Sequence, residues 1–236
     1  MSSSLHRQLL ITFSGLDGCG KSTQIEYLRS YLGGHNLTVK VLAFWDDVVV
    51  FSRVREGFVH KAFGSERGIG APGRPVQRRD KNVRKWYLSL VRHALYLLDG
   101  LHLVTVIATA RRSGADVIIM DRYIYDELAN LPLSNPLTRV FVRMVAAMVP
   151  RPDLAYLLDA DPESARSRKP EYPTDFLRLC RGAYLTLARM LKEFTVILPL
   201  ELPQARSAVE NACAAVLEAN RETAGWPTEE ARYLRP

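Results

Sequence analysis

The 236-residue sequence predicts a three-layer α/β fold, in which a doubly wound parallel sheet of five strands lies between two layers of helices. Short apolar runs alternate along the chain with longer segments of helical periodicity. The apolar runs are rich in leucine and β-branched residues without polar alternation, as expected of parallel strands covered on both faces. A hydrophobic fraction of 47% and a charged fraction of 24% are ordinary for a globular chain. The length suits a single domain that spans residues 1–236.

The elements follow one another in β–α order. The five expected strands are Gln8–Ser14, Thr38–Phe44, Asp116–Met120, Asp153–Leu158 and Phe194–Leu198. The expected helices are Lys21–Leu32, Val48–Phe63, Asn82–Arg112, Pro136–Met148, Pro162–Ser167, Thr174–Lys192 and Pro203–Asn220. Gly33 and Gly34 should end the first helix, because glycine suits the C-cap. Asp161 and Pro162 suit the N-cap and first turn of the short fifth helix.

A basic loop of about residues 64–81 separates the second and third expected helices. Four glycines and two prolines between Gly64 and Pro75 preclude regular structure there. Seven Lys and Arg residues stand against two carboxylates from Gly64 to Lys85. Such a loop can bind nucleic acid or a small anion, or be a solvated insertion. Because no aromatic residues are interleaved with the charges, we favour a flexible loop near a phosphate site and expect no nucleic-acid partner.

The remaining composition bears on the compartment. The three cysteines are widely spaced and include no C-x-x-C pair, so neither a disulfide framework nor a zinc site is expected, which suits a reducing cytoplasm. The first residues lack the apolar core of a signal peptide. The apolar stretches are interrupted by charge before the ~18 residues that a membrane span requires, so no membrane partner is expected. The tail, residues 221–236, should be a loosely docked extension.

The strongest motif joins the first strand to the first helix. Residues 15–22 read G-L-D-G-C-G-K-S and fit the G-x-x-x-x-G-K-[ST] phosphate-binding loop, in the strand–loop–helix context that the motif requires. Backbone N–H groups and the helix dipole then stabilise phosphate charge. Lys21 should reach the β- and γ-phosphates, and the Ser22 hydroxyl should ligate Mg²⁺. The sequence therefore predicts a nucleoside triphosphate site made of Gly15, Leu16, Asp17, Gly18, Cys19, Gly20, Lys21, Ser22 and Thr23.

A second motif, Asp121-Arg122-Tyr123, ends the third strand. In a protein with a phosphate loop, a carboxylate that ends a neighbouring strand can hold Mg²⁺, directly or through water. Arg122 can clamp a phosphate with two parallel donors. The alternative is a structural ion pair at the strand end, but the phosphate loop upstream favours a functional role.

A third motif is a lid of about residues 161–173. Its short helix delivers Arg166, Arg168 and Lys169 together. A cationic lid that closes over a nucleotide would stabilise the charge that phosphoryl transfer spreads over the equatorial oxygens. A solvated basic helix end is the alternative.

Together these motifs resemble the thymidylate kinase family over roughly Leu9 to Leu191. Residues 15–23 are similar to the family's G-x-D-G-x-G-K-S-T loop, residues 121–123 to its D-R-Y motif, and residues 152–159 to its P-D-L-x-x-x-L-D strand. The resemblance implies a nucleoside monophosphate kinase fold of the P-loop NTPase type and Mg²⁺-dependent transfer of the ATP γ-phosphate to a nucleotide, by family default dTMP. It also implies that Asp17 lies close to the transferring phosphate, that Arg122 holds the acceptor's phosphate and that a homodimer can form. Since Cys19 stands where some members carry a catalytic arginine, the lid should supply the catalytic cations.

The acceptor pocket departs from the family pattern. After the second strand the family has E-P-G-G-T, whereas this chain has W-D-D-V-V at residues 45–49. The long helix of the family carries an aromatic residue and then D-R; the register puts Tyr96 and Asp99 there, but Gly100 in place of the base-reading arginine. A pocket without that arginine loses discrimination for the group it read. The acceptor-binding residues that we expect are Asp46, Asp47, Arg92, Tyr96, Asp99, Arg122, Tyr123 and Asp126.

Two other functions stay open. A kinase of a hydroxyl acceptor, such as a deoxynucleoside, would use Asp46 or Asp47 as a base, although Asp46 could equally cap the following helix. A regulator would bind a nucleotide through the phosphate loop without catalysing phosphoryl transfer. The chain lacks the N-K-x-D motif of guanine-binding switches.

Overall fold

The structure, a computed structural model, describes residues 7–50 and 86–224. Its five strands form one sheet in the order β2-β3-β1-β4-β5, and every neighbouring pair is parallel. The strands are β1 (Leu9–Gly15), β2 (Val39–Ala43), β3 (Val117–Asp121), β4 (Leu154–Leu158) and β5 (Phe194–Ile197). The α/β fold is therefore confirmed, and the five expected strands differ from the observed ones only at their ends.

The helices of the described residues also follow the expected order. They are α1 (Lys21–Gly34), α3 (Trp86–Arg111), α4 (Ile124–Leu128), α5 (Pro136–Met148), α6 (Pro162–Arg168), α7 (Thr174–Leu191) and α8 (Leu202–Ala224), with a single π-helical turn, η1 (Phe44–Val48). The sequence did not indicate η1 or α4, and α1 runs through Gly34 instead of ending before it. Most of the expected helix Val48–Phe63, the basic loop 64–81 and the end of the tail lie outside the described residues.

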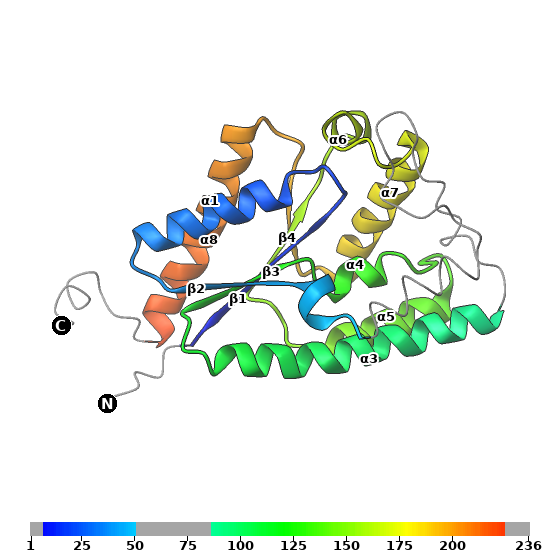
Figure 1. Cartoon of the computed structure of the whole chain (residues 1–236), viewed down its shortest axis with the longest axis horizontal. Helices are drawn as coiled ribbons and strands as arrows, with labels where there is room; N and C mark the ends of the chain where they lie inside the picture. The colour runs from blue at the N-terminus through cyan, green and yellow to red at the C-terminus, as the bar shows by residue number, and fades with distance from the viewer. Residues whose placement is uncertain (1–6, 51–85, 225–236) are drawn as a thin grey trace.

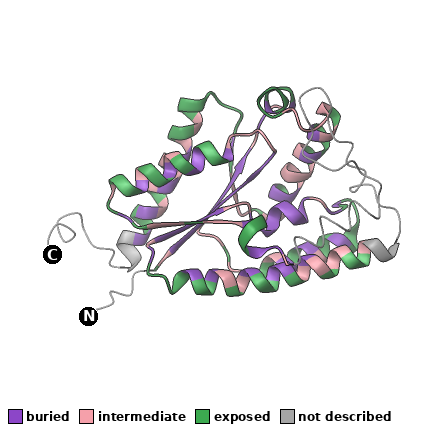
Figure 2. Ribbon diagram, in the orientation of Figure 1, coloured by how far each residue is buried: buried purple, intermediate pink, exposed green. Residues whose placement is uncertain are grey.

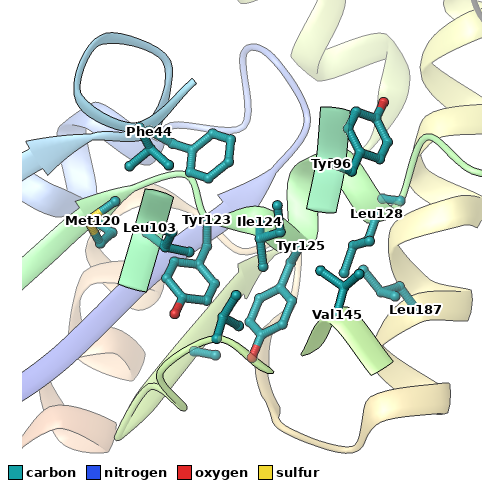
Figure 3. Packing of buried hydrophobic residues seen from close by; sticks show 14 of the residues in the cluster. Phe44, Tyr96, Leu103, Met120, Tyr123, Ile124, Tyr125, Leu128, Val145 and Leu187 are labelled. Atoms are coloured by element: carbon teal, nitrogen blue, oxygen red, sulfur yellow. The ribbon is translucent and has the colours of Figure 1, made fainter. Parts of the chain in front are cut away.

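Two layers of helices cover the sheet (Figure 1). α1 and α8 pack on one face, in a cluster that includes Ile11, Leu28 and Cys213. α3, α4, α5 and α7 pack on the other face around buried residues such as Tyr125 and Leu187, and Figure 3 shows part of this cluster. Figure 2 shows the inner strands as buried and the outward sides of the helices as exposed. Burial on both faces explains why the strand sequences lack polar alternation.

The long helix α3 carries the most apolar part of the described chain. Over Ser89–Arg111 it is long and apolar enough to cross a membrane by length and composition, so the expectation that charge interrupts every apolar stretch was too strict. A core helix passes the same test, however, and α3 contributes Leu103 and Ile107 to the core. The helix is therefore weak evidence of a membrane protein.

Parallel pairing brings the sequence motifs to one edge of the sheet. The register aligns Phe13 with Asp121, and Gly15 with Leu158. The carboxyl ends of β1, β3 and β4 consequently lie side by side, where ligands of open α/β sheets bind. The phosphate loop, the Asp121-Arg122-Tyr123 motif and the lid all begin there.

Candidate active site

The phosphate loop wraps tightly between β1 and α1. Gly15, Gly18 and Gly20 have φ values of 143°, 82° and 93°, which L side chains rarely adopt. A Cβ at Gly18 would collide with the carbonyl oxygen of Ala165, so the backbone of the lid helix α6 lies directly against the loop. No side chain among the described residues caps α1 at Gly20, so the first N–H groups of the helix are left for an anion.

Lys21 is folded onto the loop that carries it. The side chain is 7% exposed, and its ammonium donates to the carbonyls of Gly15 at 2.9 Å and Leu16 at 2.8 Å. The same Nζ lies 3.7 Å from the Cys19 Sγ. The ammonium is thus held inside the loop, and the predicted contact with phosphate oxygens would require it to leave these carbonyls.

An ion pair between Asp17 and Arg122 joins the phosphate loop to the end of β3. Arg122 has a left-handed backbone with φ of 68°, and its N–H donates to the Phe13 carbonyl at 2.9 Å. Burial raises the pKa of the Asp17 carboxyl, whereas the neighbouring cations, Arg122 and Lys21 above all, lower it. The effect of the cations is the larger, so the pKa lies below its ordinary value. Two residues that the sequence placed in different motifs therefore form one site.

Asp126 lies behind Arg122 and is only 5% exposed. Its carboxylate accepts hydrogen bonds from the Ser14 hydroxyl at 2.7 Å, the Tyr184 hydroxyl at 2.7 Å and the Tyr123 N–H at 3.1 Å. The Nη1 of Arg122 lies 3.4 Å from it. We expected Asp126 to bind an acceptor, but a buried carboxylate with four donors of its own argues against direct contact with one. Ser14 and Tyr184 belong to no sequence motif and were not expected at the site.

Asp121 and Ser22 fit the predicted role as magnesium ligands. Asp121 lies on the same side of β3 as Val117 and Ile119, which pack toward α1, so its carboxylate faces the helix that carries Ser22 in its first turn. Its Oδ1 is buried and has no hydrogen-bond partner within the described residues. No group of three or more His, Cys, Asp or Glu side chains there could hold a metal ion. Mg²⁺ commonly keeps several waters and binds few protein ligands besides substrate phosphates, so Ser22 and Asp121 stay the predicted ligands.

The lid helix begins as predicted, with Asp161 as N-cap accepting from the Ser164 N–H at 3.0 Å and Pro162 in the first turn. Its cations have different surroundings. Arg166 donates to the Thr174 hydroxyl at 3.2 Å, and Arg168 donates to a carbonyl of its own helix. Lys169 lies 3.3 Å from Glu171, and its charge also helps to lower the pKa of Asp17. Of the three expected lid cations, Lys169 is the one whose charge reaches the phosphate loop in this way.

The segment after β2 is attached to α3. Asp99, fully buried, accepts from the Val50 N–H at 2.9 Å, and the His102 Nδ1 lies 2.7 Å from the Val48 carbonyl oxygen. Asp47 accepts from the Ala43 N–H at 2.7 Å and so fastens the π-helical turn. Asp46 is exposed, and its side chain forms no hydrogen bond within residues 7–50 and 86–224. Of the two carboxylates, it is therefore Asp47 that binds backbone.

Two further expected acceptor residues, Tyr96 on α3 and Tyr123 just before α4, and Gly100, which replaces the family's base-reading arginine, also have defined surroundings. Tyr96 is 7% exposed and belongs to the apolar cluster on this face of the sheet. In Figure 3 its hydroxyl points away from the other labelled side chains. A Cβ at Gly100 would meet the Met148 Cε at 2.8 Å, so this position faces α5. Tyr123 is fully buried and its hydroxyl donates to the Pro150 carbonyl, so the expected contact between Tyr123 and an acceptor is not favoured.

Comparison with known proteins yields a consistent group of relatives. The thymidylate kinase of Bifidobacterium longum subsp. infantis is 29% identical over 191 residues, which cover 76% of this chain and 74% of the relative. The probable thymidylate kinases of Methanosphaera stadtmanae and Archaeoglobus fulgidus are each 25% identical, over 80% and 83% of this chain and 88% of each relative. Over most of its length the chain is therefore similar to thymidylate kinases of bacteria and archaea. No family model matches it.

The similarity to thymidylate kinases indicates that the chain is a kinase, and its all-parallel sheet is consistent with the α/β fold of such kinases. The resemblance drawn from the phosphate loop, the Asp121-Arg122-Tyr123 motif and residues 152–159 is thus confirmed. The roles of individual residues remain predictions.

Proposed function

We propose that the chain transfers the γ-phosphate of ATP to a nucleoside monophosphate, with dTMP as the acceptor and Mg²⁺ as the cofactor. The observation that carries the proposal is the contact between Asp17 and Arg122, next to Lys21. This contact places Arg122, which suits an acceptor phosphate, next to the phosphate loop, where Lys21 suits the phosphates of the donor. Names of relatives from bacteria and archaea support the same acceptor.

Each step can be assigned to residues of this chain. Lys21 exchanges the Gly15 and Leu16 carbonyls for the β- and γ-phosphates of ATP, which also lie at the N-terminus of α1. Arg122 exchanges Asp17 for the phosphate of the acceptor. Ser22, with Asp121 nearby, would hold Mg²⁺, which would supply positive charge to neutralise the transferring phosphate.

The transfer needs no base on the protein, because an acceptor phosphate is already ionised. The bond between the γ-phosphorus and its bridging oxygen breaks, a bond from an acceptor oxygen to the γ-phosphorus forms, and ADP leaves. The lid cations Arg166, Arg168 and Lys169 are proposed to stabilise the charge that spreads over the equatorial oxygens. Arg166 and Arg168 must first leave their contacts with Thr174 and Ser164.

An assay of ADP release with a panel of acceptors tests this function. The proposal predicts ADP release that depends on dTMP and is lost in Lys21→Ala. Release with thymidine but not with dTMP would instead show a hydroxyl kinase, the second candidate. That candidate is favoured by Asp46, an exposed carboxylate at the end of β2, which a hydroxyl could use as a base. ATP binding without acceptor-dependent ADP release would indicate a regulator.

We further propose a cytoplasmic homodimer. Adjacent helices α3 and α5 expose large apolar side chains, namely Leu90, Val91, Leu98, Leu101, Leu137, Val140 and Met144. Exposed apolar side chains gathered on neighbouring helices mark a contact surface. Light scattering of the wild type and of Leu98→Glu with Leu137→Glu decides the matter: a dimer that becomes a monomer supports the proposal, and a monomeric wild type contradicts it.

A further inference from the structure

Arg122 divides its guanidinium between two carboxylates that differ in exposure. Nη2 donates to Asp17, and Nη1 lies 3.4 Å from Asp126. The side chain of Asp17 is 27% exposed, whereas that of Asp126 is 5% exposed. An incoming anion can therefore displace Asp17 from the Nη2 side while Asp126 stays in place on the Nη1 side.

Asp126 is fixed from three other directions. The Ser14 hydroxyl on β1 and the Tyr184 hydroxyl on α7 each donate to it at 2.7 Å, and the Tyr123 N–H donates at 3.1 Å. A buried carboxylate with this many donors has little capacity left to accept a proton from a substrate. This geometry argues against Asp126 as a base and against direct contact with an acceptor.

The backbone at Arg122 also depends on this cluster. A left-handed φ in a residue other than glycine costs free energy and persists only where neighbours determine it. The Arg122 N–H is held by the Phe13 carbonyl, and the next N–H, of Tyr123, is held by Asp126. Asp126 therefore contacts both the side chain of Arg122 and the peptide that follows it.

Tyr184 connects this cluster to the helix that follows the lid. One turn earlier on α7, Arg181 forms two hydrogen bonds of 2.7 Å with Asp159 at the end of β4. Arg181 and Tyr184 thus attach one side of α7 to the end of β4 and to α4. The phenol of Tyr184 stays protonated, because burial, and then Asp126, raise its pKa well above the ordinary value.

We propose that Asp126, held by Ser14 and Tyr184, is the positioning residue that orients Arg122 so that its Nη2 side receives the acceptor's phosphate. The inference rests on the proposed function, since it concerns the residue that would hold that phosphate. It assigns Ser14 and Tyr184 a role in acceptor affinity, although neither touches the acceptor.

Steady-state kinetics of Asp126→Asn and Tyr184→Phe test the proposal, with Tyr125→Phe as the matched control. Tyr125 also donates its hydroxyl to a carboxylate, that of the partly buried Glu193 at 2.8 Å, on the same side of the sheet but without contact to Arg122. We expect the KM for the acceptor to rise about tenfold in Asp126→Asn and Tyr184→Phe, the scale of a lost hydrogen bond to a charged group. The KM for ATP should change by less than about twofold in all three variants, a change that corresponds to under 0.5 kcal/mol.

The control separates positioning from folding. Tyr184→Phe and Tyr125→Phe should lower the melting temperature to a similar extent, because each loses one hydroxyl–carboxylate bond. The proposal is overturned if the two KM values change equally in Asp126→Asn, or if Tyr125→Phe raises the acceptor KM as much as Tyr184→Phe does.

A second readout needs no substrate. In protein labelled with ¹⁵N-arginine, the Nε–H signal of Arg122 is identified by its loss in Arg122→Lys. That signal should stay narrow and unshifted in Tyr125→Phe, and should shift or broaden in Asp126→Asn and Tyr184→Phe. An unchanged signal in Asp126→Asn overturns the proposal. If no monophosphate supports turnover by the wild type, the proposed function fails, while this spectrum still decides whether Asp126 orients Arg122.

Discussion

Asp17 in the phosphate loop and Arg122 at the end of β3 form an ion pair across the site. The pair links the group that lies beside the donor to the group that suits the acceptor, although 105 positions separate them along the chain. In the proposed reaction this ion pair must break, because Arg122 binds the acceptor's phosphate and Asp17 lies beside the phosphate being transferred. The pair therefore describes the nucleotide-free enzyme, and its opening accompanies binding of the acceptor.

The ammonium of Lys21 is the most sensitive position for catalysis. Lys21→Ala should reduce kcat by about a thousandfold or more, because a buried charge that stabilises the transferring phosphoryl group is lost. Acceptor-dependent ADP release measures the effect, and circular dichroism should show an intact fold. Lys40→Ala, on the edge strand β2, is the control and should keep its activity. Turnover like that of the wild type in Lys21→Ala would refute the assignment.

The stability that Asp17 contributes should depend on pH. Because its folded pKa is below the unfolded value of 3.8, the ion pair stabilises the fold at pH values above 3.8 and loses its effect as the pH falls through the folded pKa. Asp17→Asn should therefore lower the free energy of unfolding by about 1 kcal/mol near pH 6, since the pair is partly exposed. That difference should shrink below about pH 4. Urea unfolding from pH 3 to pH 7 measures it; a difference that is constant with pH contradicts the account.

Gly18 allows the lid helix to touch the phosphate loop. Gly18→Ala should be destabilising for two reasons, a φ of 82° and a collision with the Ala165 carbonyl, and should weaken ATP binding by displacing the lid. Gly114→Ala isolates the first reason, because Gly114 has a similar φ of 78° and open space around its Cβ. It should cost only about 1 kcal/mol of unfolding free energy and leave ATP affinity unchanged. Equal effects of the two substitutions on ATP affinity would exclude a functional contact between lid and loop.

Asp121 should affect magnesium more than folding. Its Oδ1 is buried without a partner among the described residues, so Asp121→Asn should preserve or raise stability in the absence of Mg²⁺. The same substitution should raise the Mg²⁺ concentration required for half-maximal activity by about tenfold, the low end of what weakened ligand support costs. Thermal unfolding with EDTA and a Mg²⁺ titration of activity provide the two measurements. An unaltered Mg²⁺ requirement argues for a structural carboxylate.

The elements that the sequence predicts well are those with a strong local pattern. The runs at Leu9–Gly15 and Val117–Asp121 are buried on both faces, and their composition alone identifies them as strands. The helix Ile124–Leu128 escaped prediction because it is five residues long and begins with β-branched and aromatic residues. The π-helical turn Phe44–Val48 was not predicted, because it is stabilised in part by packing against α3, in addition to the hydrogen bond from the Ala43 N–H to Asp47.

The candidate site likewise contains residues that a local motif identifies and residues that only the fold brings together. The phosphate loop has fixed spacing, so residues 15–23 can be identified from the sequence alone. The cluster around Asp126 cannot, because Ser14 and Tyr184 lie 112 and 58 positions away and meet it only through the order of the strands. For Asp99, the family register suggested a role in the acceptor pocket, which stays a prediction, whereas the contact with the Val50 N–H depends on how the chain leaves β2.

A crystal structure with dTMP, Mg²⁺ and a non-hydrolysable ATP analogue tests the central claim most directly. We predict that Lys21 contacts the triphosphate, and that the Nη2 side of Arg122 contacts the dTMP phosphate while Nη1 stays with Asp126. If the ion pair between Asp17 and Arg122 is intact in that complex, with dTMP bound away from Arg122, the account is contradicted.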